Sequence, residues 1–215
     1  AMQAKLPDFA VARWDRHQQV DYLAVSAQMD LADFTLNVTR PWARDPGMYV
    51  DELQRLAYVD LPLKGDALTA YQARLRTIPA YLAQARVNLD SVAADYADLA
   101  IHSLSNGDGV GHGMPYRATE PEGLVGWFDD LRARAVVQQP ELLPEIDAAR
   151  QAIAGFRDWL IASRPAMTAP AGVGKAAYDW FLTNVRLMPY DSDEIVTLAE
   201  RELTRHWANY TTERH

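Results

Sequence analysis

Residues 68–89 read LTAYQARLRTIPAYLAQARVNL, and this stretch decides the fold. Its apolar residues recur at alternating spacings of three and four: Leu68, Tyr71, Leu75, Ile78, Leu82, Ala85 and Leu89. This spacing places them on one face of a helix, and other helices must cover that face. Pro79 lies inside the pattern and is expected to kink the helix or to split it near Thr77. We therefore expect a long, bent helix within a multi-helix packing.

The same periodicity extends along the rest of the chain. An apolar face covers about 20–38 and ends before Pro41, whose ring cannot continue a helix interior. Further helices are expected at about 47–58, 91–104, 119–137, 141–163, 175–187 and from 191 onward. We find no convincing strand and no internal repeat. The prediction is an all-α fold, an irregular array of about seven to nine helices, some long and kinked, with no significant sheet.

Signals at the helix ends refine this prediction. Asp90 or Ser91 can cap the helix that reaches about Leu104. The glycine-rich stretch 105–117 is expected to form a loop. Two pairs have the spacing of a capping box: Thr119 with Glu122, and Asp191 with Glu194.

A stretch rich in proline, alanine and glycine suggests how the chain is organised. Residues 165–174 form this stretch, which we interpret as a linker. It separates a helical N-terminal region, 1–164, from a helical pair, 175–215.

Composition excludes several classes of function. The chain has 215 residues, no cysteine and a formal net charge of −8. Disulfide, thiolate and iron–sulfur chemistry are therefore excluded, and the negative charge argues against nucleic acid as a partner. No apolar stretch approaches the roughly 20 residues that span a bilayer. The compartment stays open between cytoplasm and periplasm or secretion, because an upstream signal could have been removed.

No motif in the chain supplies a complete catalytic or metal-binding site. None of the five histidines stands in an H-E-x-x-H or a Glu-x-x-His pattern. Glu202 and His206 lie one helical turn apart, where we expect a surface hydrogen bond and not a metal site. The loop 106–112 does not match a calcium loop, and 172–175 lacks two residues of a phosphate-binding loop. We therefore expect no cofactor in this chain.

A cluster near the C-terminus is the best candidate for a binding surface. Core packing is the alternative use of its aromatic side chains. The residues that could line a cleft are Lys175, Tyr178, Trp180 and Tyr190.

Several segments together resemble one family. Residues 40–49 read RPWARDPGMY, in which the matching residues are Arg40, Pro41, Trp42, Arg44, Asp45, Pro46 and Tyr49. Further matches follow in order at 74–82, 88–89, 113–117, 174–182 (beginning with Gly174), 184–185, 189–190 and 202–203. These segments are similar to a bacterial family called domain of unknown function 885, and the resemblance covers most of the chain.

The resemblance implies a helical fold similar to zinc carboxypeptidases of the thermostable-carboxypeptidase type. In such enzymes an H-E-x-x-H helix and a later glutamate hold zinc, and a bound water attacks the peptide carbonyl. Those residues would follow position 215, so zinc is expected only in a full-length parent and no catalytic residue is carried over.

Three hypotheses follow from this resemblance. In the first, the chain is the N-terminal part of a metallopeptidase, with a missing C-terminal catalytic half as its partner and a peptide as substrate. The alternatives are a stand-alone helical module that binds proteins or peptides, and a peptidase half that binds peptides without cutting them.

Overall fold

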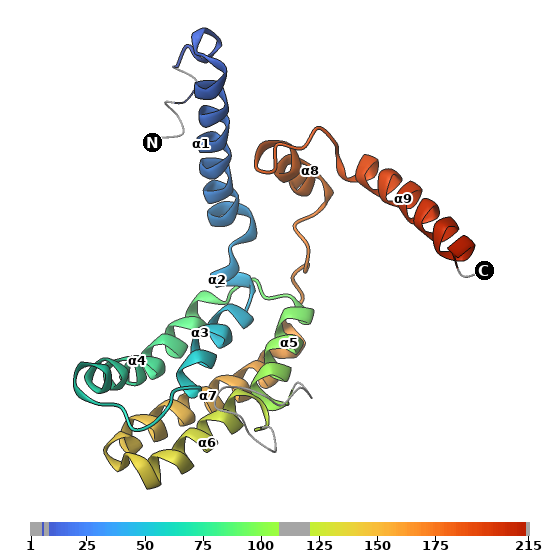
Figure 1. The fold of residues 1–215 in the computed structure, drawn as a ribbon. Helices are drawn as coiled ribbons and strands as arrows, with labels where there is room; N and C mark the ends of the chain where they lie inside the picture. Colours follow the sequence, from blue (N-terminus) through green and yellow to red (C-terminus); the bar gives the residue numbers. More distant parts are fainter. Residues whose placement is uncertain (1–5, 7–8, 108–120, 214–215) are drawn as a thin grey trace. The chain divides into compact units, whose positions relative to one another are not determined.

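The computed structural model describes residue 6 and residues 9–107 and 121–213 (Figure 1). Its helices are α1 (Arg16–Phe34), α2 (Pro41–Arg44), α3 (Gly47–Ala57), α4 (Gly65–Asn88), α5 (Ala94–Ser105), α6 (Gly123–Gln138), α7 (Leu143–Ser163), α8 (Lys175–Asn184) and α9 (Ser192–Glu213). Among the described residues there is no sheet, only an isolated bridge between Ala93 and Ala169. The predicted all-α fold is confirmed. The segment 113–117 of the family resemblance and Thr119 lie outside the described residues.

Contacts divide the chain into two compact units. Unit 1 contains residues 1–40 and 172–215, and unit 2 contains residues 41–171. The N-terminal helix α1 is thus grouped with α8 and α9. The sequence pattern did not predict this grouping. The division into 1–164, 165–174 and 175–215 describes composition, not contacts, and stays a prediction.

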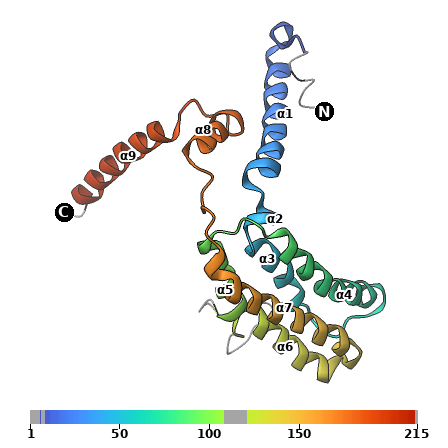
Figure 2. The ribbon, with the colours of Figure 1, turned by 180° about the vertical axis from the view of Figure 1, so that it is seen from behind.

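The core of unit 2 forms where the stripe of α4 meets α7. Both helices run alongside each other in the two opposite views of Figures 1 and 2. The α4 residues Leu75, Ile78 and Leu82 are at most 2% exposed. The buried residues of α7 recur at the same helical spacing: Ile146, Ala149, Ile153, Phe156 and Leu160. Helices α5 and α6 also pack on α7, so α7 is the central element of this unit.

Pro79 does not split α4. The helix is continuous from Gly65 to Asn88 with the proline inside it, so of the two expected outcomes the split near Thr77 is wrong, while the kink stays a prediction. Pro79 has no N–H for the carbonyl four residues earlier. The Thr77 hydroxyl donates to the Arg74 carbonyl at 2.7 Å, which supports the backbone of this turn. Burial of the stripe on both sides of Pro79 keeps the two halves in one helix.

Two of the expected helix caps can be compared with the structure. Asp191 and Glu194 form the predicted capping box, with reciprocal backbone-to-carboxylate bonds of 2.9 and 3.0 Å. The prediction for α5 is wrong, because its N-cap is Ala93 and no side chain bonds there. Ser91 instead donates its hydroxyl to Asp90, and its amide N–H to the Ala43 carbonyl.

Buried polar side chains hold the loop between α3 and α4. Gln139, 3% exposed, accepts from the Leu63 N–H at 2.8 Å and donates to the Leu63 carbonyl at 2.9 Å. Arg134 donates to the carbonyls of Ala57 and Val59. Arg134 thus satisfies carbonyls at and just after the end of α3, and Gln139 satisfies both backbone groups of Leu63 in the loop before α4.

Unit 1 contains a smaller apolar contact. Helix α1 begins with a capping box formed by Asp15 and Gln18. Phe34, near its end, is buried against α8, where its ring stacks on Trp180 and contacts Phe181. Helix α9 has no buried residue.

Replacing Leu75 with alanine tests the role of the α4 stripe. The side chain is fully buried, so its removal leaves a cavity and should lower the free energy of unfolding by about 2–5 kcal/mol. Urea unfolding followed by tryptophan fluorescence measures the change. The control Leu99→Ala removes a side chain that is 63% exposed on α5 and should cost less than about 0.5 kcal/mol. Equal losses for the two variants would contradict this account of the core.

Candidate functional site

The predicted cleft residue Lys175 ties α8 to the start of α9. Its ammonium contacts Asp179 at 2.6 Å, the Ser192 hydroxyl at 3.1 Å and Asp193 at 3.4 Å. The Ser192 amide N–H donates to the other oxygen of Asp179 at 2.9 Å. Gly174, with φ of 85°, allows the sharp turn by which the chain enters α8.

These contacts change the acidity of both charged groups. The hydrogen bonds from Lys175 and Ser192 lower the pKa of Asp179 from 3.8 to about 2. The hydrogen bond to Asp179 in turn raises the pKa of Lys175. Because Lys175 is exposed and Asp179 only half-buried, the shifts describe a local ion pair at the surface and not a buried catalytic dyad.

The three aromatic candidates have different surroundings within unit 1. Trp180 stacks on Phe34 with the ring planes 5° apart. Tyr178 is 47% exposed and lies against Phe181. Tyr190 lines a separate groove, on α9, with apolar and charged neighbours. The described residues do not gather the four candidates into one pocket, and their role in a cleft stays a prediction.

The RPWARDPGMY segment, residues 40–49, determines how the backbone passes from one short helix into the next. We call this segment the joint. Arg40 adopts a left-handed conformation, φ 42°, where the preceding helical run ends, and Pro41 begins α2. The Asp45 carboxylate accepts from the Gly47 N–H at 2.8 Å, in the turn that contains Pro46 before α3. Polar groups of this segment thus direct the chain from one short helix into the next.

Two side chains of the same segment reach distant parts of unit 2. Arg44 donates to the carbonyls of Pro170 and Ala171, which lie more than 120 residues later. Tyr49 donates its hydroxyl to the Trp42 carbonyl at 2.7 Å and accepts from the Asn88 amide at 3.1 Å.

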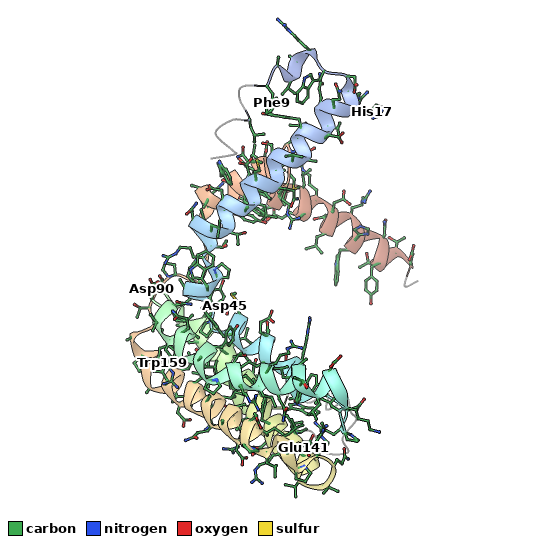
Figure 3. All side chains as sticks on the ribbon, turned by 90° about the vertical axis from the view of Figure 1, so that its left-hand side faces the viewer. Phe9, His17, Asp45, Asp90, Glu141 and Trp159 are labelled. Atoms are coloured by element: carbon green, nitrogen blue, oxygen red, sulfur yellow. The ribbon has the colours of Figure 1, made fainter. Side chains whose placement is uncertain are left out.

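The two ends of unit 2 meet at this joint. Tyr96 also donates to the Ala171 carbonyl, at 2.9 Å. Figure 3 shows Asp45 and Asp90 toward one end of unit 2 and Glu141 at the other. Arg44, Asp45 and Tyr49 of this segment therefore stabilise the region where the two ends of unit 2 come together.

Metal ligands do not converge in the described part of the chain. No group of three or more His, Cys, Asp or Glu side chains there could hold an ion. The His206 ring nitrogen lies 3.8 Å from Glu202, too far for the expected hydrogen bond, because Glu202 accepts from Arg205 instead. None of the helices in the described ranges is both long and apolar enough to cross a bilayer.

Arg44→Ala tests the joint. Loss of Arg44 removes its hydrogen bond to the Pro170 carbonyl and one of the two to the Ala171 carbonyl, which keeps the bond from Tyr96, so the free energy of unfolding should fall by about 1–3 kcal/mol. Urea unfolding measures this change. The matched control Arg55→Ala, an exposed arginine of α3, should change stability by less than about 0.5 kcal/mol. If Arg44→Ala is as stable as the control, Arg44 does not hold the joint.

The acidity of Asp179 provides a second test. Since its pKa is lowered on folding, its stabilising contribution is present above pH 3.8 and is lost as the pH falls through about 2. The NMR shift of the Ser192 amide should titrate with a midpoint near pH 2 and should not titrate in Asp179→Asn. A midpoint near the ordinary value of 3.8 would show that the ion pair does not form.

Comparisons with known proteins agree with the fold and with the family resemblance. The model of a family described as "Bacterial protein of unknown function (DUF885)" matches residues 1–213. No curated protein matches the chain. A solved structure from Shewanella oneidensis, described as "a putative lipoprotein of unknown function", is similar in fold, with 19% identity and a TM-score of 0.65. That match covers 94% of this chain and 36% of the solved chain, so the present chain spans about a third of its length. This chain belongs to the bacterial family of unknown function DUF885.

Proposed function

We propose that this chain is the N-terminal helical region of a zinc metallopeptidase of the carboxypeptidase type. In this proposal the region shapes the cleft in which a peptide binds, and the catalytic residues belong to another part of the polypeptide.

The exposed apolar face of α9 carries the proposal. None of the helix's residues is buried, although its apolar stripe contains large side chains. Leu203 is 68% exposed, Trp207 64% and Tyr210 50%. An amphipathic helix gains most of its stability by burying such a face. We therefore infer that another part of the parent protein packs on α9.

The length of the solved relative supports the same proposal. About two thirds of that chain lies outside the match, which leaves room for a further domain to cover α9. Membership in a family of unknown function neither supplies nor excludes peptidase chemistry, so the activity rests on the motif resemblance alone.

Zinc does not fit the described residues of this chain. Glu202 and His206, which lie one turn apart, belong to no group of three ligand types among the described residues. In this proposal, zinc is held by another part of the polypeptide.

A stand-alone binding module is the second candidate. The same exposed stripe of α9 could dock on a separate protein, without any enzymatic activity. The two candidates differ in what covers α9: a later part of the same polypeptide, or a different molecule.

The test of the activity uses the protein encoded by the whole reading frame that contains this sequence. We expect an H-E-x-x-H helix after position 215 and release of C-terminal residues from peptides. A chelator should abolish the release, and added zinc should restore it. The 215-residue chain alone should be inactive and should bind no zinc at micromolar concentrations by calorimetry. A stop codon directly after His215 would favour the stand-alone module.

Trp207→Glu tests the docking of α9. In the isolated chain the side chain is exposed, so the melting temperature should not change. In the full-length protein the charge would be buried, and the free energy of unfolding should fall by at least about 2 kcal/mol. Asn209→Glu adds the same charge about half a turn away, on the opposite face of α9, and should leave both proteins unchanged. An unaffected full-length Trp207→Glu variant would disprove the docking.

A further inference from the structure

Three aromatic rings line a pocket at the start of α1. The pocket has a volume of about 340 Å³, near the lower end of the range for small-molecule sites. The aromatic residues are Phe9, Trp14 and Tyr22, and Figure 3 shows Phe9 beside the first turns of the helix. The pocket lies within unit 1, and its lining does not include Phe34, which packs on α8.

Hydrogen bonds hold the segment before α1 against the first turns of that helix. The side-chain amide of Gln19 donates to the carbonyls of Val11 at 3.4 Å and Trp14 at 3.0 Å. The Tyr22 hydroxyl donates to the Leu6 carbonyl at 3.2 Å. The residues that carry the rings are thus fixed before any ligand binds, which lowers the entropy that binding would cost.

The rings are oriented so that one ligand can contact more than one of them. The ring centroids of Trp14 and Tyr22 lie 6.0 Å apart, with the planes at 81°. Phe9 lies on the Trp14 ring at 5.8 Å and 58°. A cation is attracted to an aromatic face when it lies within about 6 Å of the ring centroid. One cationic group can therefore lie within this distance of both the Trp14 and the Tyr22 centroid.

The rings are accessible to a ligand. Phe9 is 52% exposed, and Trp14 and Tyr22 are partly exposed. The short helix Val11–Arg13 between Phe9 and Trp14 contains no buried residue. Rings that served only as a core would be buried, whereas these rings leave surface that a ligand can cover.

Asp21 carries the only charge among the described residues that line the pocket. It lies one turn after Gln18 and one turn before Val25 on α1, and all three residues line the pocket. Its carboxylate is exposed and forms no hydrogen bond or ion pair with another described residue. Arg13 and Arg16 are near in sequence but do not line the pocket. The charge of the pocket therefore favours a cation.

The polar groups of the lining favour a cation without N–H donors. The Gln18 side-chain oxygen already accepts from the Asp15 N–H, and the Tyr22 hydroxyl already donates to the backbone. A primary ammonium has three N–H donors, which need acceptors when it leaves water. A quaternary ammonium has none, so aromatic faces and a nearby negative charge are sufficient for it.

We propose that this pocket binds the trimethylammonium group of a quaternary ammonium compound. The methyl groups contact the rings of Trp14 and Tyr22, Phe9 adds apolar contact, and the Asp21 carboxylate attracts the positive charge from the rim. The proposal rests neither on peptidase activity nor on the docking of α9. Its failure would leave both untouched, and their failure would leave this pocket untouched.

An NMR titration of the 215-residue chain with choline tests the proposal. Ring currents should shift the methyl signal of choline, with a Kd at or below about 1 mM. Dimethylbutanol has the same shape as choline, with a carbon in place of the nitrogen and no charge. It should bind at least about fivefold more weakly, and so should ethanolamine, which has a primary ammonium. If dimethylbutanol binds as tightly as choline, or choline does not bind, the proposal fails.

Variants assign the rings and the charge. Trp14→Leu keeps an apolar side chain but removes the aromatic face, so it should weaken choline at least about fivefold. The matched control Trp207→Leu removes an exposed ring of α9 and should bind choline as the native chain does. Native-like binding by Trp14→Leu would overturn the proposal.

Asp21→Asn tests the charge without removing a ring. The residue is exposed, so the fold should persist, and choline should bind about twofold to threefold more weakly. Asp51→Asn, at an exposed position of α3 that does not line the pocket, should have no effect. Equal binding by the two variants would show that the Asp21 carboxylate does not attract the ligand.

Two further measurements identify where the group comes from. The protein encoded by the whole reading frame should bind choline as the 215-residue chain does. Loss of binding there would show that another part of the polypeptide covers the rings, and would overturn the proposal. Phosphatidylcholine carries the same trimethylammonium group on a lipid. Sedimentation of the whole protein with phosphatidylcholine vesicles would identify a lipid headgroup as the ligand, whereas choline binding without sedimentation would identify a free solute.

Discussion

The burial of two facing apolar stripes, one on α4 and one on α7, is the interaction on which the described structure depends most. Each fully buried leucine, isoleucine or phenylalanine contributes about 1.5–3 kcal/mol. The largest fully buried side chains include Leu75, Ile78 and Phe156. A single charged hydrogen bond contributes about as much as one such residue. The stripes therefore outweigh any one polar contact, and the polar contacts are formed where the packed helices leave backbone groups to satisfy.

Much of the fold can be predicted from the sequence because helical periodicity is a local property. Spacings of three and four residues report one face of a helix whatever covers it. The same patterns hold no information about which helices meet. The grouping of α1 with α8 and the bond from Arg44 to Pro170 depend on contacts between distant residues. Pro79 shows that a local signal for a helix break can be overridden, because the packing of α4 outweighs the cost of a proline within it.

The candidate site is harder to predict than the fold for a related reason. A dense run of aromatics such as Tyr178 and Trp180 fits either a cleft or a core, and composition cannot separate these uses. In the structure Trp180 stacks on Phe34, a use that its local sequence does not reveal. Glu52 and Arg74 line a groove between α3 and α4 that the sequence alone does not reveal, because only the pairing of the two helices brings these residues together.

The family segment, residues 40–49, and helix α9 use their side chains in different ways. Arg44, Asp45 and Tyr49 direct their polar groups at backbone atoms, so these residues maintain the path of the chain. Such residues explain why the segments resemble a family without revealing its chemistry. Helix α9 differs from this segment, because its large apolar side chains do not take part in the packing of the described residues. It is held by its capping box and by contacts at its start, yet its large apolar side chains are exposed. Local bonds of this kind are enough to define the direction of a helix, but they leave its apolar face available. Under the proposal above, the part of the protein that packs on that face is the one that carries the chemistry.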